Sequence, residues 1–191
     1  MNFPRILKKR KGYIDRIKPF MQKSVVKVLT GQRRVGKSFL LYQLIEEILA
    51  KEPDANNLED FTFSSLQTAE DLHSYIISHS KEKAKNYIFI DEIQDIPGFE
   101  KVIRSLLLNE DNDIYITGSN AKMLSGELAT YLSGRYIEFK IYSLSYSEFL
   151  EFHGLTESET SYELYSRYGG LPYLLNLPLE DETVNEYLKS V

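Results

Sequence analysis

Short apolar runs alternate with longer amphipathic segments through residues 25–142. The apolar runs are bounded by polar or turn residues and predict five strands, at Val25–Leu29, Phe61–Phe63, Tyr87–Ile90, Ile114–Ile116 and Tyr136–Tyr142. Between these runs, apolar residues recur at helical spacing in 40–48, 72–76 and 99–107. Strands that alternate with helices favour an α/β fold with a parallel sheet and right-handed crossover connections.

The pattern changes after Ser143. Apolar residues there recur at helical spacing only, in 146–150 and 162–165, and acidic residues strongly outnumber basic ones. We therefore expect two parts, a core at residues 1–143 with a basic N-terminal segment and a small helical lobe at 144–191. The final residues, DETVNEYLKSV, stop inside a helix-like pattern, so we also expect a chain truncated at its C-terminus.

Composition limits the possible classes of site and location. The chain has 191 residues, 42% of them hydrophobic, which suffices for one core or for a core with a small lobe. Without cysteine, neither disulfides nor thiolate metal sites are possible, and the three histidines are scattered. No apolar stretch reaches the roughly 18 residues of a membrane span, and no signal-peptide pattern begins the chain. The sequence predicts a soluble, cytoplasmic protein without a membrane partner.

Positive charge is concentrated near the start of the chain. Residues 1–40 hold 12 of the 23 basic residues against the single acid Asp15, although the whole chain carries a net charge of -5. This segment could contact nucleic acid, or it could be a solvated edge beside a phosphate site. No cluster of aromatic and basic residues after it indicates a nucleic-acid channel.

The stretch GQRRVGKS at residues 31–38, the phosphate loop, lies between a predicted strand and a predicted helix. Backbone N–H groups at such a junction converge on one point, and the helix dipole adds partial positive charge. Lys37 can reach the β- and γ-phosphates of a nucleotide, and Ser38 can offer its hydroxyl to Mg²⁺. The predicted nucleotide-binding residues are Gly31, Gln32, Arg33, Arg34, Val35, Gly36, Lys37, Ser38 and Phe39. Because Phe39 replaces a frequent second hydroxyl residue, it would contact the α-phosphate only through its backbone.

Two carboxylates follow the apolar run YIFI. Adjacent side chains diverge at a strand end, so Asp91 is predicted to hold Mg²⁺ and Glu92 to polarise the attacking water. A further polar cluster, TGSN, ends the next predicted strand, where Asn120, or alternatively Ser119, could sense the γ-phosphate. The alternative for this cluster is a turn with a helix N-cap.

Five blocks of the chain together resemble a known family. The sequences GQRRVGKS, YIFIDEIQDIPGFEKVIRSL, YITGSNAKMLSGELATYLSGRYIEF, YSLSYSEFLEF and YGGLPYLL are similar to consecutive blocks of prokaryotic AAA+ ATPases related to archaeal ATPases and to signal-transduction (STAND) NTPases. The resemblance covers roughly residues 12–191. It implies a three-layer P-loop NTPase sandwich with a five-stranded parallel sheet in the order 5-1-4-3-2, followed in the family by a further C-terminal domain.

Two more site residues are implied by the resemblance alone. Arg135 corresponds to an arginine finger or a phosphate-sensing arginine, with a surface salt bridge as the alternative. Pro172, in Gly169-Gly170-Leu171-Pro172, matches a motif that brings the helical lobe against the adenine, with a simple helix breaker as the alternative.

The sequence supports two functions. The first is magnesium-dependent ATP hydrolysis coupled to a conformational change, for which Glu92 is the main argument. The second is a nucleotide-dependent regulatory switch with slow turnover, which the resemblance to STAND proteins keeps open. Both need ATP and Mg²⁺, and both allow a homo-oligomer and a protein partner or effector that the sequence does not identify.

Overall fold

The computed structural model describes residues 8–60, 66, 68–119, 130–132 and 134–190. Contacts between residues divide the chain into two units. The sheet unit comprises Met1–Gly31 and Lys37–Lys140, and the helical unit comprises Gln32–Gly36 and Ile141–Val191. The middle of the phosphate loop therefore groups with the C-terminal residues, although it lies between two segments of the sheet unit in the sequence.

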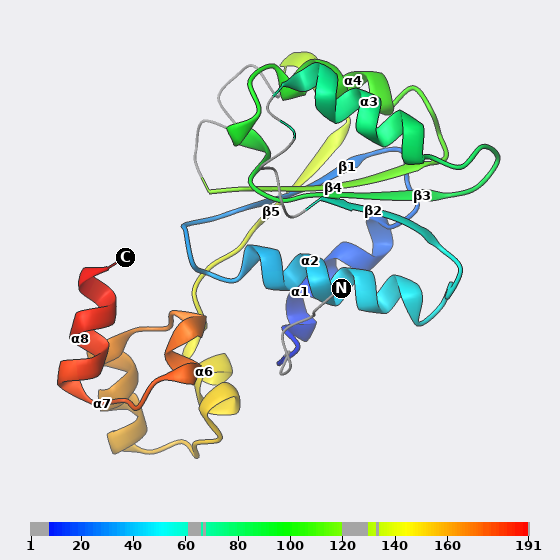
Figure 1. Cartoon of the computed structure of the whole chain (residues 1–191). Helices are drawn as coiled ribbons and strands as arrows, with labels where there is room; N and C mark the ends of the chain where they lie inside the picture. Colours follow the sequence, from blue (N-terminus) through cyan, green and yellow to red (C-terminus); the bar gives the residue numbers. More distant parts are fainter. Residues whose placement is uncertain (1–7, 61–65, 67, 120–129, 133, 191) are drawn as a thin grey trace. The chain divides into compact units, whose positions relative to one another are not determined.

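The sheet unit is built on five parallel strands: β1 (Val26–Thr30), β2 (Asn56–Asp60), β3 (Asn86–Ile90), β4 (Asn112–Gly118) and β5 (Tyr136–Lys140). Their order is β2-β3-β4-β1-β5 (Figure 1). Read from the other edge this is 5-1-4-3-2, which confirms the predicted fold and strand order. The register pairs Val28 of β1 with Ile116 of β4 and with Glu138 of β5.

One strand differs from the sequence prediction. The structure has β2 at Asn56–Asp60, where we predicted no strand, and the predicted strand at Phe61–Phe63 lies outside the described residues. The sequence NNLED lacks the apolar run of a central strand. Because β2 is an edge strand of the described sheet and pairs only with β3 there, its backbone can join the sheet without such a run.

Helices cover both faces of this sheet. Figure 1 shows α1 (Lys11–Ile17) and α2 (Lys37–Leu49) on one face, with α3 (Ala69–His79) and α4 (Phe99–Leu106) on the other. Short 3-10 turns, η1 (Lys18–Phe20) and η2 (Ile93–Asp95), complete the unit among the described residues. The main core lies between the central strands and the α3 and α4 face, where Ile88, Ile114 and Ile103 are among the fully buried side chains.

The helix boundaries follow local sequence signals. Thr68 caps α3 by accepting the Asp71 backbone N–H, while the Asp71 carboxylate accepts the Thr68 N–H. Helix α2 ends at Leu49, before Pro53, as the periodicity predicts.

No helix within the described parts of the chain combines the length and the apolar character needed to span a membrane.

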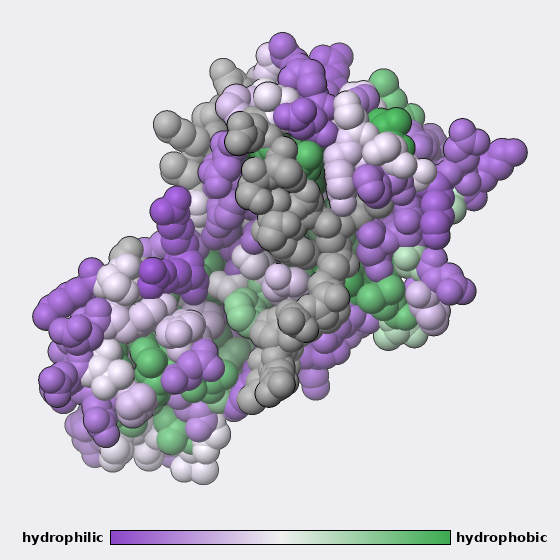
Figure 2. Space-filling view, in the orientation of Figure 1, coloured by the Kyte–Doolittle hydropathy of each residue, from purple (hydrophilic) through white to green (hydrophobic). Residues whose placement is uncertain are grey.

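The helical unit contains α6 (Tyr146–His153), α7 (Glu159–Tyr168), the 3-10 helix η4 (Pro172–Asn176) and α8 (Asp181–Lys189). Ser145 and Glu148 form a capping box at the start of α6, and Gly169 ends α7 with a φ of 74°. Small apolar clusters around Phe149 and Leu174 form its interior. Among the coloured residues on the face drawn in Figure 2, hydrophilic ones predominate and hydrophobic ones form separate small patches.

Candidate functional site

Three central strands bring the predicted site residues to one edge of the sheet. Strand β1 leads into the phosphate loop, β3 is followed by Asp91 and Glu92, and β4 ends with Thr117 and Gly118. Because β3, β4 and β1 are neighbours and parallel, these three ends lie side by side. The carboxyl edge of an open α/β sheet is the usual place for a ligand.

Asp91 is held by two hydroxyl groups. Ser38 Oγ donates to Asp91 Oδ2 at 2.6 Å, and Thr117 Oγ1 donates to Asp91 Oδ1. The structure thus brings together the two residues that the sequence predicted as metal ligands, Ser38 and Asp91. A carboxylate and a hydroxyl on adjacent elements form the hard oxygen donor set that suits Mg²⁺, with waters and phosphate oxygens completing the shell.

Glu92 adopts a backbone conformation that is rare for a residue with a side chain. Its φ is 47°, and its backbone N–H donates to Thr117 Oγ1 at 2.9 Å. Its carboxylate lies 3.3 Å from Lys37 Nζ and accepts a hydrogen bond from Gln94 Nε2 at 2.7 Å. The two adjacent carboxylates therefore have different partners, as the predicted division of roles requires.

The protonation state of Glu92 is set by opposing effects. Partial burial disfavours its charged form, but hydrogen bonds from Gln94 and Ser119 and the ion pair with Lys37 outweigh burial and hold the pKa of Glu92 below its usual value. Glu92 is therefore an ionised hydrogen-bond acceptor at neutral pH. Lys37 is almost completely buried, and its ammonium group also donates to the Gly31 carbonyl oxygen at 3.1 Å.

The middle of the phosphate loop belongs to the helical unit and has two unusual backbone angles. Gly36 has a φ of 94°, which L-residues rarely adopt, and Arg34 has a φ of 67°. A β-carbon on Gly36 would lie 3.7 Å from Cγ of Pro172, so the proline ring of η4 packs beside the loop. Gly170 approaches Leu144 so closely that a β-carbon there would lie 2.2 Å from the Leu144 carbonyl oxygen.

Other predicted site residues have simpler surroundings. Phe39 is 47% exposed, and its ring packs edge-on against Tyr42 at a centroid distance of 6.3 Å. Asn120 lies outside the described residues, whereas Ser119, the alternative sensor, donates a hydrogen bond that favours ionised Glu92. Gln32, Arg33 and Val35 remain predictions as nucleotide contacts.

Arg135 lies at the opposite edge of the sheet from the phosphate loop. It directly precedes β5, and its carbonyl oxygen accepts the backbone N–H of Val26 at the start of β1. With about 3.3 Å of rise per residue, β1 places roughly 13 Å between Val26 and Thr30. Arg135 is exposed, and within the described part of the chain its guanidinium makes no hydrogen bond or ion pair.

Two residues of the site were not assigned from the sequence. Thr117 connects the Asp91 carboxylate with the Glu92 backbone, and Gln94 donates to the Glu92 carboxylate. In the segment TGSN, whose first two residues end β4, the sequence pattern indicates a sensor or a turn and assigns no role to the threonine. Thr117 could have been identified from its position at the end of the strand next to β3. That neighbour relation is known only once the strand order is known.

A buried polar cluster occupies the amino edge of the same sheet. Lys27 and Asp113 are fully buried and form an ion pair, and Asp113 also accepts hydrogen bonds from Tyr115 and from the Gln22 backbone. Burial outweighs the attraction of Asp113 and lowers the pKa of Lys27.

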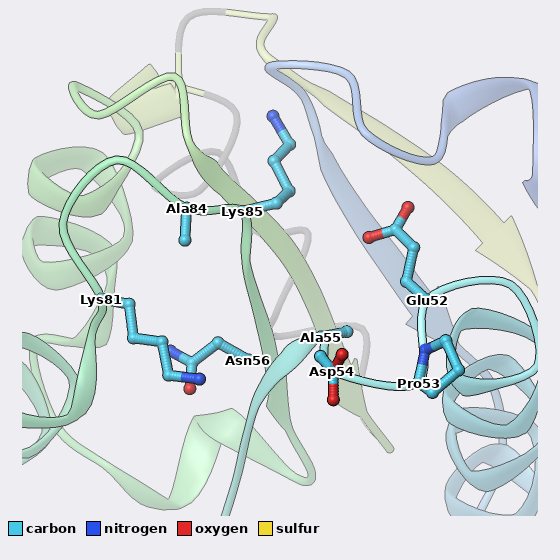
Figure 3. A pocket seen from close by; sticks show the side chains of 8 residues that line it. All are labelled: Glu52, Pro53, Asp54, Ala55, Asn56, Lys81, Ala84 and Lys85. Atoms are coloured by element: carbon cyan, nitrogen blue, oxygen red, sulfur yellow. The ribbon is translucent and has the colours of Figure 1, made fainter.

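A shallow pocket of about 350 Å³ opens near this edge, between residues 52–56 and 81–85 (Figure 3). Two of its four charged residues are engaged within the protein. Glu52 accepts from Gln22 and Tyr87, and Lys85 donates to the Glu110 carbonyl oxygen. We assign the functional site to the carboxyl edge, because the phosphate-loop residues and the two strand-end carboxylates contact one another there.

The sheet order, the loop between β1 and α2, and the strand-end carboxylates define the P-loop NTPase class, in its AAA-type form. A family model described as AAA domain matches residues 23–150, and the chain belongs to this family. Two curated relatives are an uncharacterized protein of Haemophilus influenzae, 38% identical over 193 residues, and an uncharacterized protein of Methanocaldococcus jannaschii (MJ1544), 30% identical over 181 residues. The matches cover 95% and 87% of this chain but only 47% and 40% of these relatives.

Solved structures share the fold at low sequence identity. Cdc6p from Pyrobaculum aerophilum matches with a TM-score of 0.58 and 13% identity, over 88% of this chain and 57% of that one. Hsp104 of Saccharomyces cerevisiae, in a complex with casein, matches with a TM-score of 0.55 and 14% identity, over 90% of this chain and 36% of that one. These likenesses establish the fold of the chain.

Proposed function

We propose that the chain binds MgATP at the phosphate loop and hydrolyses it, and that turnover is coupled to a conformational change. The observation that carries the proposal is the paired arrangement at the carboxyl edge. Asp91 is bonded to Ser38, while the neighbouring Glu92 is ionised and faces Lys37. These different surroundings support a metal-binding role for Asp91 and a water-activating role for Glu92, which is the division that phosphoanhydride hydrolysis needs.

Each side chain has a defined task in this proposal. Ser38 and Asp91 hold Mg²⁺, which when bound would neutralise charge on the phosphates. Lys37 binds the terminal phosphates, and Glu92 accepts a hydrogen bond from the attacking water and then its proton. Thr117 positions both residues, because its hydroxyl donates to the Asp91 carboxylate and accepts the Glu92 backbone N–H.

The Lys37–Glu92 ion pair gives nucleotide binding a second effect. Lys37 Nζ and Glu92 Oε1 are 3.3 Å apart, so a lysine that moves toward a phosphate leaves the carboxylate. Glu92 then has a free oxygen for the water. Nucleotide would in this way release the base that acts on it.

Arg135 is proposed to act on a neighbouring copy of the chain. Its place beside Val26 separates it from its own phosphate loop by the length of β1, which an arginine side chain does not span. In a head-to-tail oligomer the same arginine can meet the next copy's γ-phosphate. Pro172 is proposed to contribute to the adenine side of the site and Asn120 to sense the γ-phosphate.

A slow regulatory switch is the second candidate, and the same ion pair favours it. A base held by Lys37 is less available to water, which slows turnover until the pair opens. Single-turnover release of γ-phosphate measures this directly. Release in seconds to minutes supports the ATPase, whereas bound ATP that persists for hours supports the switch.

We do not extend the proposal to nucleic acid. The Aeropyrum pernix Orc1 protein, which shares the fold with a TM-score of 0.57 and 12% identity, is known in a complex with DNA. In this chain Lys9 and Lys18 both lie within 3.4 Å of the Glu47 carboxylate on α2, so part of the basic segment is neutralised internally. The proposed partners are nucleotide, a second copy and an effector protein in the cytoplasm.

The decisive experiment is nucleotide binding by a Lys37→Ala variant. A ligand at about 100 times its Kd stabilises the folded state by roughly 2.7 kcal/mol, so MgATP should raise the Tm of the wild-type protein. Lys37→Ala should remove that shift. Lys101→Ala, an exposed lysine on α4, is the matched control and should keep it. A shift of unchanged size in Lys37→Ala would reject the assignment.

A further inference from the structure

Arg34 stands in the middle of the phosphate loop in a conformation that an arginine rarely adopts. Its φ of 67° places it in the left-handed region, where a side chain is sterically disfavoured. Such a conformation persists when surrounding contacts hold it. In this chain the Arg34 side chain contacts the C-terminal helix α8.

Two contacts join Arg34 to the end of α8. Its guanidinium carbon lies 5.3 Å from the centre of the Tyr187 ring, within the range of a cation–π interaction. Its Nη2 donates to the Ser190 carbonyl oxygen at 3.2 Å, directly after the helix. A cation is favourable at this end of a helix because unpaired carbonyls and the negative end of the dipole lie there.

Tyr187 also connects Arg34 with a second contact on the loop. Its ring stacks on Tyr173 with a centroid distance of 5.0 Å and an interplanar angle of 24°. Tyr173 follows Pro172, whose ring packs beside Gly36. One cluster of the helical unit, formed by Pro172, Tyr173 and Tyr187, therefore contacts the loop at Gly36 and at Arg34.

The hydroxyl group of Tyr187 has no role in this cluster. It is buried and has no hydrogen-bond partner among the described residues. The ring, which receives the guanidinium and stacks on Tyr173, is the part that matters. A Tyr187→Phe variant, which keeps the ring and removes only the hydroxyl, can therefore separate the two contributions.

We propose that Arg34 is a positioning residue that fixes the phosphate loop through α8, so that the packing of α8 sets the affinity for nucleotide phosphates. The inference rests on the proposed nucleotide site. A loop held in its binding conformation loses less conformational entropy when a phosphate binds. Because such coupling is reciprocal, bound nucleotide also stabilises α8.

A nucleotide titration with four single variants tests this role. Arg34→Ala and Tyr187→Ala should each weaken the affinity for a fluorescent ADP analogue by on the order of fivefold. The Arg34→Ala/Tyr187→Ala double variant should lose little more than either one, because both remove the same contact. Tyr187→Phe keeps the ring, and Lys101→Ala removes an exposed lysine on α4 that has no part in the proposed site, so both should bind like wild type.

Other results would overturn the inference. Wild-type affinity in Tyr187→Ala would show that α8 does not act on the loop. Losses that multiply in the double variant would show that Arg34 contacts the nucleotide independently of Tyr187.

Amide hydrogen exchange of 181–189 provides a second measurement that does not depend on nucleotide. Without ligand, Arg34→Ala should exchange faster there than wild type, and the control Lys101→Ala should not. Equal exchange in all three proteins would refute the contact. If Lys37→Ala binds nucleotide normally, the proposed function fails, while this exchange result still decides the role of Arg34.

Discussion

Replacement of Glu92 by glutamine should separate nucleotide binding from hydrolysis. Glutamine fills the same space and keeps one oxygen that can accept from Gln94, which now donates to Glu92 at 2.7 Å. The amide cannot take a proton from water, and loss of a general base costs about 10²- to 10⁴-fold in rate. We expect the kcat of Glu92→Gln to fall by that amount.

The same substitution should not weaken binding, and the structure sets the size of any gain. In the wild type, Lys37 Nζ lies 3.3 Å from a Glu92 oxygen, and we expect this ion pair to weaken when the lysine binds a phosphate. The Glu92 side chain is 31% exposed, and partly exposed ion pairs contribute at most about 1 kcal/mol. Removing the pair should therefore leave ATP affinity unchanged or raise it by up to about fivefold.

Two assays on the same preparations check this prediction. Equilibrium titration with a fluorescent ATP analogue gives the Kd, and phosphate release in a single turnover gives the rate of the chemical step. Gln94→Ala is the matched control, since it removes a partner of Glu92 but keeps the carboxylate, and it should retain most of the activity. If Glu92→Gln hydrolyses ATP at the wild-type rate, or binds it ten times more weakly, our reasoning about Glu92 is wrong.

Four further predictions follow from the geometry. Asp91→Asn should weaken nucleotide binding in the presence of Mg²⁺ but not in EDTA, as titrations in both buffers would show. Asp113→Asn should leave the buried Lys27 without its ion-pair partner and lower the free energy of unfolding by about 3 kcal/mol, without changing nucleotide affinity. A decrease of less than about 1 kcal/mol, measured by urea unfolding, would contradict this. Because folding lowers the pKa of Glu92, its charge stabilises the protein above pH 4.5, and this contribution disappears as the pH falls through the folded-state pKa. Glu92→Gln should therefore reduce the dependence of Tm on pH in this acidic range. Arg135→Ala mixed with Glu92→Gln should regain activity that neither has alone, and a mixture that associates yet stays inactive would refute action between copies.

Much of the fold could be predicted from the chain itself. Short apolar runs form buried strands, and apolar residues at helical spacing form the face of a helix that packs on a core. The sequence therefore predicts β1, β3 and β4 and the helices α2, α3 and α4. The sequence also revealed the phosphate loop and Asp91-Glu92, because these residue types have few other reasons to follow a buried strand. β2 was not visible, since an edge strand with the sequence NNLED needs no apolar run.

Other features depend on residues that meet only in three dimensions. No spacing in the sequence shows that Thr117 joins Asp91 to the Glu92 backbone, because that contact requires β4 to lie next to β3. Likewise, Arg34 and Tyr187 are distant in the chain, and only the packing of the helical unit brings the guanidinium over the ring. A local pattern specifies strands, helices and loop chemistry because these depend on neighbouring residues. The partners of each side chain are decided by strand order and packing, which are properties of the whole fold.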